Sequence, residues 1–277
     1  MHDNSVATMS LSINNKFVAT FVLTVIAILL FVVNFLPIEN LLALIVFCVG
    51  LYALSEIDSH KKPLSVGVWL ITFILGFFVS TYRPLGFSYP LIWSVDSLYP
   101  GGDSFQLYAN FAKALCGYFI IIWLLGTVNT AGKFSTAYAV SLSLVSALVL
   151  IGFAVVLFDL EAAYKLPART LYFVAINFGI AVVAEEAYFR LLLQAQIERF
   201  FNHSFAGKIT ALIVASLLFA FAHTGGLSQA FFLFLIAGFI YGAVFTATRR
   251  ISAPILCHFA VNFIHFIFFE YPLNMSG

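Results

Sequence analysis

The chain has 277 residues, of which 62% are hydrophobic and only 9% are charged, and its formal net charge is +1. A soluble domain carries roughly 25% charged residues, so this chain cannot cover a water-facing surface, and it offers no basic patch for nucleic acid. The three cysteines, Cys48, Cys116 and Cys257, lie at irregular spacing within apolar runs, which argues against a disulfide framework or a zinc knuckle. We therefore expect an integral membrane protein.

Nine apolar segments follow a short polar stretch, residues 1–16, which we expect to be cytoplasmic. The first segment is too long for the core of a signal peptide and is interpreted as a retained span. Backbone groups in lipid must be satisfied internally, so each segment should be helical. The predicted fold is an all-α, polytopic transmembrane helical bundle of about nine spans, or eight if the short second segment does not cross. The segments are approximately 17–37, 40–55, 65–82, 106–128, 136–158, 171–197, 207–224, 228–248 and 251–270.

Lysine and arginine favour the cytoplasmic ends of membrane spans. One set of alternate segment ends holds Lys16, Lys61, Lys62, Lys133, Arg199, Lys208, Arg249 and Arg250, and the other holds only Arg83, Lys165 and Arg169. This bias predicts a cytoplasmic N-terminus and an outer C-terminus, and we expect a bacterial inner membrane.

The longest loop, about 83–105, would lie outside. Its tyrosines, its tryptophan and the turn at Pro100-Gly101-Gly102 favour a loop at the lipid interface, and a lid that contacts substrate is the alternative. Lys113, early in the fourth segment, is expected to extend its ammonium group to the outer interface.

Two carboxylates lie deep in a predicted span, Glu185 and Glu186, and Arg190 follows on the same helix. Ionisable groups in a bilayer cost on the order of 2.5–3.5 kcal/mol each, so they mark function by default. Glu186 and Arg190 are four residues apart and can pair on one face. Glu185 lies about 100° around the helix and needs another partner.

Candidate partners occur in later segments. The seventh contains Phe219 and His223, and the ninth contains His258 and Asn262, which share a helix face. A carboxylate desolvated in lipid is a stronger base toward water, while a histidine can hold the water and another can join an asparagine amide in donating to an oxyanion. Convergence of these groups predicts hydrolysis of a peptide bond.

At these residues the chain resembles the family of CAAX proteases and bacteriocin-processing enzymes, in particular the type II CAAX prenyl endopeptidases. The family motif Glu-Glu-x-x-x-Arg is matched by Glu185, Glu186 and Arg190. The motif Phe-x-x-x-His is matched by Phe219 and His223, and His-x-x-x-Asn by His258 and Asn262. The three motifs occur in the family's order and cover about residues 170–269.

The resemblance implies a glutamate-dependent endopeptidase without a metal or other cofactor. By analogy Glu185 would be the general base, His223 would lie beside the water, and His258 and Asn262 would form the oxyanion hole. Glu186 and Arg190, with Phe219, would support the site. The implied substrates are membrane-anchored proteins or peptides that are cut near the membrane.

The domain organisation that follows is residues 17–168 as N-terminal helices of unassigned role and residues 169–277 as the catalytic core. Two other functions stay open at the level of sequence. Two histidines and a glutamate could bind zinc in a peptidase, although His-Glu-x-x-His is absent from the sequence. Buried carboxylates and histidines also occur in transporters, so the second alternative is a membrane protein without catalytic activity: a transporter, a scaffold or an immunity protein.

Overall fold

A computed structural model describes residues 11–57, 62–128, 134–158 and 160–271 of the chain. Seven helices in this part are long and apolar enough to cross a membrane, and two shorter apolar helices accompany them. The all-α, polytopic membrane fold predicted from composition is thereby confirmed. One long helical stretch over residues 170–200 lies at the centre and is described below. The helices around it are α1 Ile13–Val32, α2 Ile38–Glu56, α3 Lys62–Thr81, α4 Phe111–Leu124, α5 Thr136–Phe158, α9 Phe205–Thr224, α10 Gln229–Thr248 and α11 Ser252–Phe268.

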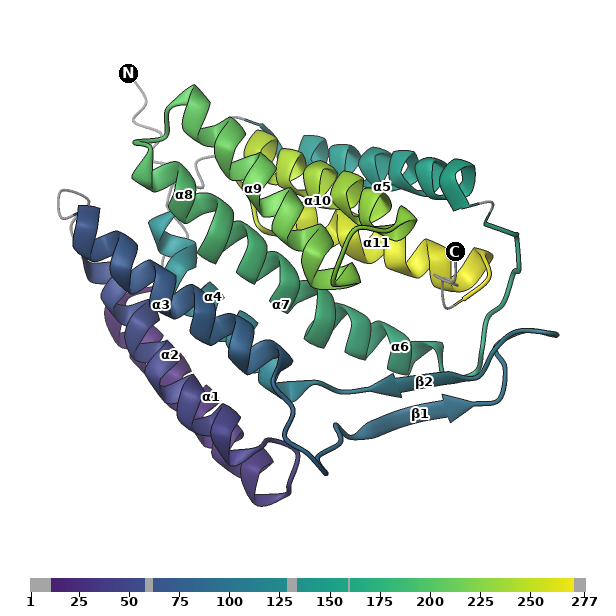
Figure 1. Ribbon diagram of the computed structural model, residues 1–277, viewed down its shortest axis with the longest axis horizontal. Coiled ribbons are helices and arrows are strands. Elements are labelled where there is room, and N and C mark those ends of the chain that lie inside the picture. The colour runs from purple at the N-terminus through teal and green to yellow at the C-terminus, as the bar shows by residue number, and fades with distance from the viewer. Residues whose placement is uncertain (1–10, 58–61, 129–133, 159, 272–277) are drawn as a thin grey trace.

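The centre of the molecule is one continuous helical rod over residues 170–200 (Figure 1). Two stretches of wide π-helical turns interrupt its α-helical geometry, on either side of the short α-helical piece that holds both glutamates. Such π turns are frequent at functional sites. The rod is composed of α6 Thr170–Ile176, η2 Asn177–Val182, α7 Val183–Glu186, η3 Ala187–Gln194 and α8 Ala195–Phe200.

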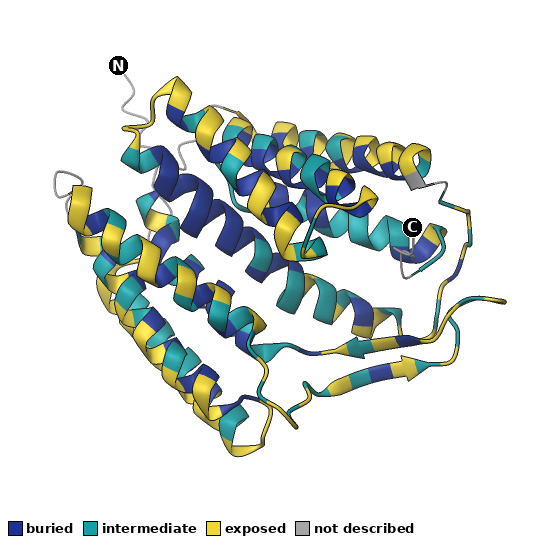
Figure 2. Ribbon diagram, in the orientation of Figure 1, coloured by how far each residue is buried: buried dark blue, intermediate teal, exposed yellow. Residues whose placement is uncertain are grey.

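Two groups of helices enclose this rod. Helices α3 and α4 pack on one side, while α9, α10 and α11 pack on the other. Figure 2 shows that burial is concentrated along the rod from α7 to α8, while α1 and the outward faces of the other helices are largely exposed. In α1 only Ala27 is buried, and Phe21 is 69% exposed. Exposed apolar side chains of this kind suit contact with lipid.

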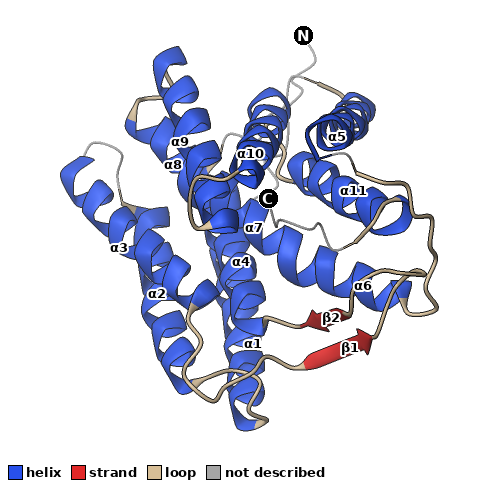
Figure 3. Ribbon diagram, turned by 45° about the vertical axis from the view of Figure 1, so that its right-hand side comes forward, coloured by secondary structure: helices blue, strands red, loops and turns tan. Residues whose placement is uncertain are grey.

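The loop predicted over about 83–105 contains the first strand and the turn of an antiparallel hairpin, which the sequence did not predict. Strands β1, Leu91–Val95, and β2, Phe105–Tyr108, pair beside α6 (Figure 3). Gly101, in the turn between them, has a φ of +82°, a value that glycine adopts at little cost. Trp93 and Phe105 pack with Phe266 of α11 and Phe173 of α6. The hairpin therefore uses its aromatics to cover helix ends, which side-chain composition alone did not reveal.

The second segment, the weakest of the nine predicted spans, is confirmed as a 19-residue helix that is long enough to span. Two other predicted segment boundaries needed correction. The fourth segment begins late, because residues 105–108 belong to β2 and the helix starts only at Phe111, where Asn110 caps it by accepting a hydrogen bond from the Lys113 amide. The first helix ends at Val32, before Asn34, whose φ is +59°.

Candidate active site

The two adjacent glutamates of α7 face different surroundings. The Glu186 side chain is fully buried, whereas the Glu185 side chain retains 13% exposure. Consecutive residues of a helix point about 100° apart, so the pair meets different sets of partners.

Glu186 belongs to a sealed polar network. Its Oε2 accepts a hydrogen bond from Nε of Arg190 at 2.9 Å, and Arg190 in turn donates to Gln194 at 3.1 Å. Gln194 donates to the carbonyl of Gly242 in α10 at 3.2 Å. A Cβ at Gly242 would lie 2.8 Å from Nη1 of Arg190, so glycine is needed there. The pairing of Glu186 with Arg190 that the sequence predicts is present.

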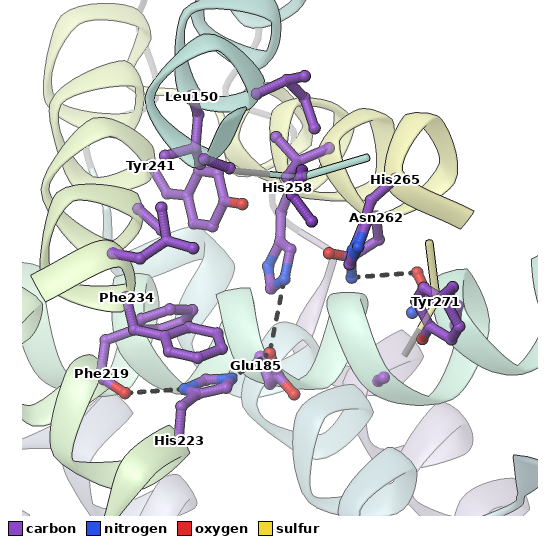
Figure 4. Close-up of a pocket in the computed structure, with 18 residues that line it drawn as sticks. Leu150, Glu185, Phe219, His223, Phe234, Tyr241, His258, Asn262, His265 and Tyr271 are labelled. Carbon is purple, nitrogen blue, oxygen red and sulfur yellow. Dashed lines mark hydrogen bonds and ion pairs between the residues drawn. The ribbon is translucent and has the colours of Figure 1, made fainter. Parts of the chain in front are cut away.

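Glu185 obtains its partners from three other helices. Its Oε1 pairs with the ammonium group of Lys113 from α4. Its Oε2 lies 3.5 Å from Nε2 of His223 in α9 and 3.7 Å from Nε2 of His258 in α11. Figure 4 shows Glu185 between the two imidazole rings. The structure thus brings together the glutamate and both histidines that the sequence predicts.

The position of Lys113 differs from the one predicted from the sequence. Lys113 does not extend to the outer interface, because an anionic partner lies within its reach on the neighbouring helix. Helix α4 approaches α7 closely at Gly117, where a Cβ would lie only 2.4 Å from Cα of Ala184, and Lys113 is about one turn earlier on the same helix. A signal for this role was present in the sequence, because an ionisable residue inside an apolar span marks function by default.

His223 is held by its other ring nitrogen and by two aromatic rings. Nδ1 lies 2.8 Å from the carbonyl oxygen of Phe219, and because a carbonyl only accepts, we assign the proton to Nδ1. The ring of Phe219 lies 4.2 Å from the imidazole, and Phe234 of α10 stacks on it at 4.7 Å. The aromatic residue of the Phe-x-x-x-His pattern therefore orients the histidine through both its carbonyl and its ring.

His258 joins the two glutamates. Its Nδ1 lies 2.9 Å from Oε1 of Glu186, while its Nε2 faces Glu185. Tyr241 of α10 stacks on the imidazole at 4.6 Å with an interplanar angle of 16°. Sequence reasoning missed Tyr241, since an aromatic residue in a phenylalanine-rich helix carries no distinguishing signal.

Asn262 lies one helical turn beyond His258. Its amide nitrogen donates to Oδ1 of Asn177 at 3.3 Å, so an unpredicted residue of the central rod orients it. Both asparagines face the same cavity as Glu185.

A cavity of about 320 Å³ opens beside these residues (Figure 4). Glu185, His223, His258 and Asn262 share its wall, whereas Glu186 and Arg190 do not. The rest of the wall is mostly apolar, although Asn177, Tyr241 and His265 also line it. Its apolar residues are Leu150, Ile151, Ala154, Leu160, Ala181, Phe219, Leu233, Phe234, Ala237 and Val261. Tyr271, at the end of the described chain, also lines it, and burial raises the pKa of its phenol to about 12. The cavity thus combines polar groups with an apolar surface.

The same side chains are the candidates for holding a metal ion. Among the residues that the structure describes, no group of three or more His, Cys, Asp or Glu side chains is arranged to hold a metal ion. The two histidines lie beside one oxygen of Glu185, and Lys113 already pairs with the other.

Fold and site together define a polytopic membrane protein with a carboxylate–histidine centre enclosed by its helices. Residues 167–264 match the family model described as type II CAAX prenyl endopeptidase Rce1-like, and this match supports the resemblance to the CAAX protease family that the motifs indicate. The family implies a protease of the CAAX type that acts within the membrane. The match includes all seven residues of the three motifs and excludes Lys113. The comparison with curated proteins found no match, and neither did the comparison with solved structures.

Proposed function

We propose that the protein is an intramembrane endopeptidase in which the Glu185 carboxylate is the general base. The observation that carries this proposal is the position of Glu185, which lines the cavity with His223 and His258 on one of its oxygens. Glu186 is excluded from this role, because Arg190 and His258 occupy its oxygens and its side chain has no exposed area.

His223 would hold the attacking water together with Glu185. With its proton on Nδ1, the neutral ring presents a lone pair at Nε2, 3.5 Å from Oε2 of Glu185. A water on the cavity side of these two acceptors can donate one hydrogen to each. Its own lone pair then points to the substrate carbonyl, and Glu185 takes the proton as the bond forms.

His258 and Asn262 would stabilise the oxyanion of the tetrahedral intermediate. His258 would donate from Nε2, which requires a proton on both ring nitrogens, because Nδ1 already faces the Glu186 carboxylate. The Asn262 amide supplies a second donor from the next turn of α11. Removing one such donor costs about 2.7–4 kcal/mol of transition-state stabilisation in other hydrolases.

The substrate class follows from the apolar wall of the cavity. Its volume of about 320 Å³ suits a short apolar peptide segment, since ligand pockets run from roughly 300 to 1,000 Å³. We infer a membrane-anchored protein or peptide whose scissile bond lies next to the anchor.

Basic residues support a cytoplasmic location for one end of the bundle. Arg199 at the end of α8 donates to the carbonyls of Leu54 and Ile57 at the end of α2. Arg250 after α10 donates to Thr136 at the start of α5. These helix ends belong to the set that the positive-inside rule assigns to the cytoplasm, and a bacterial inner membrane remains our proposal. Lys61 and Lys133, from the same set, lie outside the described residues.

The test is Glu185→Gln in the purified full-length protein, which removes the base at almost unchanged size. A proteome comparison with and without the gene first identifies a protein whose membrane anchor is no longer removed. We expect Glu185→Gln to lose cleavage of that substrate while its thermal unfolding shows a folded protein. Glu39→Gln, at an exposed position of α2, is the matched control and should cleave normally. Retained cleavage by Glu185→Gln would refute the assignment, and loss of activity on metal chelation would favour a zinc peptidase.

A further inference from the structure

Glu185 and His223 form a wall between two cavities. The larger is the cavity of about 320 Å³ described above. The smaller, of about 260 Å³, lies between α3, α4, α9 and the central rod, and Ser80, Thr81 and Lys113 line it. Lys113 is the cation of this second cavity, whereas the lining of the larger cavity contains no lysine or arginine.

The ion pair between Lys113 and Glu185 is accessible, unlike the neighbouring pair. The Lys113 and Glu185 side chains retain 27% and 13% exposure, whereas Arg190 and Glu186 retain none. Lys113 is also fixed at its base: Asn110 accepts from its backbone amide at 3.0 Å and donates to the carbonyl of Ser80 at 2.9 Å. A ligand that enters the smaller cavity can therefore reach an ammonium group with a defined position.

This pairing conflicts with the proposed role of Glu185. An ammonium group in contact with a carboxylate favours its charged form and so makes it a weaker base. Base catalysis would be assisted if another anion paired with Lys113, in place of Glu185, while the substrate is bound. Arg190 needs no such exchange of its anionic partner, because Glu186 does not face the cavity.

We propose that the smaller cavity is a subsite for a carboxylate of the substrate, which replaces Glu185 as the partner of Lys113. The exchange is purely ionic: Lys113 remains an ammonium group, and Glu185 is released to accept a proton from water. The proposal rests on the role of Glu185 proposed above. The carboxylate is supplied either by the C-terminus of the substrate or by an acidic side chain. The substrate then lies across the wall, with its apolar part in the larger cavity and its anionic part beside Lys113.

Binding of small peptides tests this independently of cleavage. The probes are N-acetyl-Leu-Leu-Leu as the free acid, the same peptide as its C-terminal amide, and N-acetyl-Leu-Asp-Leu amide. Affinities are measured for the purified full-length protein in detergent. We expect the free acid to bind the wild type more tightly than the amide. In Glu185→Gln this preference should rise to about tenfold or more, because the competing anion is gone and a charged hydrogen bond is gained.

Substitutions of Lys113 provide the decisive comparison. The double variant Lys113→Met/Glu185→Gln removes both members of the ion pair, which avoids an unpaired buried charge, and it should bind acid and amide equally. Lys113→Arg/Glu185→Gln should keep the preference, as should Lys208→Met/Glu185→Gln, which alters a lysine at the opposite end of α9 from His223.

The binding results distinguish the two sources of the carboxylate. They also distinguish failure of the proposed subsite from failure of Glu185 as the base. Tighter binding of the free acid alone supports a C-terminal carboxylate, and tighter binding of the aspartyl amide as well supports recognition of either source. Equal binding of all three probes to Glu185→Gln, or a preference that survives loss of Lys113, overturns the proposal. Because binding is measured without cleavage, failure of Glu185 as the base appears only in the activity test.

Discussion

Arg190 and Glu186 form an ion pair from which solvent is excluded, with Nε 2.9 Å from Oε2 and no exposed area on either side chain. Removing one partner of such a pair leaves an uncompensated buried charge and typically costs 3–5 kcal/mol. We predict that Arg190→Met lowers the free energy of unfolding by about this amount. The double variant Arg190→Met/Glu186→Gln should recover much of the loss, as measured by thermal or denaturant unfolding in detergent. Equal instability of the single and double variants would contradict the prediction.

The close contact between α4 and α7 yields a second prediction. A Cβ at Gly117 would lie 2.4 Å from Cα of Ala184, so Gly117→Ala forces the helices apart. Overpacking of this kind costs about 1–3 kcal/mol, and the same shift should weaken the contact between Lys113 and Glu185. Gly67→Ala is the matched control, because a Cβ there meets nothing within 4 Å and alanine favours the helix. Thermal unfolding should show Gly117→Ala destabilised and Gly67→Ala unchanged or stabilised.

Asn262 offers a kinetic prediction. If its amide donates to the oxyanion, Asn262→Ala should lower kcat by about 10²–10³ with little change in KM, because the donor acts mainly in the transition state. Asn177→Ala, which removes the group that orients Asn262, should lower kcat by less. The measurement is steady-state kinetics on the identified substrate. A change confined to KM would assign Asn262 to substrate binding instead.

We predict that His203, in the loop between α8 and α9, makes the stability of the protein depend on pH. Partial burial and the nearby Arg249 guanidinium lower the pKa of His203 below its usual 6.5, although the Glu198 carboxylate opposes this. His203 then binds a proton more readily in the unfolded chain than in the folded protein. Its contribution to the free energy of unfolding is therefore present above about pH 6.5 and is lost as the pH falls through the pKa of His203 in the folded protein. The effect should be small, because the His203 side chain is 50% exposed. The melting temperature of His203→Gln should therefore fall slightly less than that of the wild type between about pH 7.5 and pH 5. An identical fall in both proteins would refute this.

The helical spans and the local pairs were predictable from the sequence. Composition and apolar run length are enough to predict nine helices, because backbone N–H and C=O groups in lipid can form hydrogen bonds only with one another. The pairing of Glu186 with Arg190 was also predictable, since the two are four residues apart on one helix. Position within the helix likewise indicated that Glu185 and Glu186 would face different partners.

The identity of the partners was decided by tertiary structure. Lys113 and Glu185 are 72 residues apart in sequence, and so are Glu186 and His258, and no periodicity connects residues on different helices. The contact of Gly117 with Ala184 brings Lys113 to Glu185, and the packing of α11 against the rod puts His258 between both carboxylates. The hairpin escaped prediction for the same reason, because Trp93 and Phe105 are stabilised by Phe173 and Phe266 from distant helices. By itself the sequence determined that the chain forms membrane helices and which side chains are chemically unusual within them. Only the packing of the helices decided that Glu185 is the carboxylate exposed to the cavity, because burial and charge partners depend on contacts between segments.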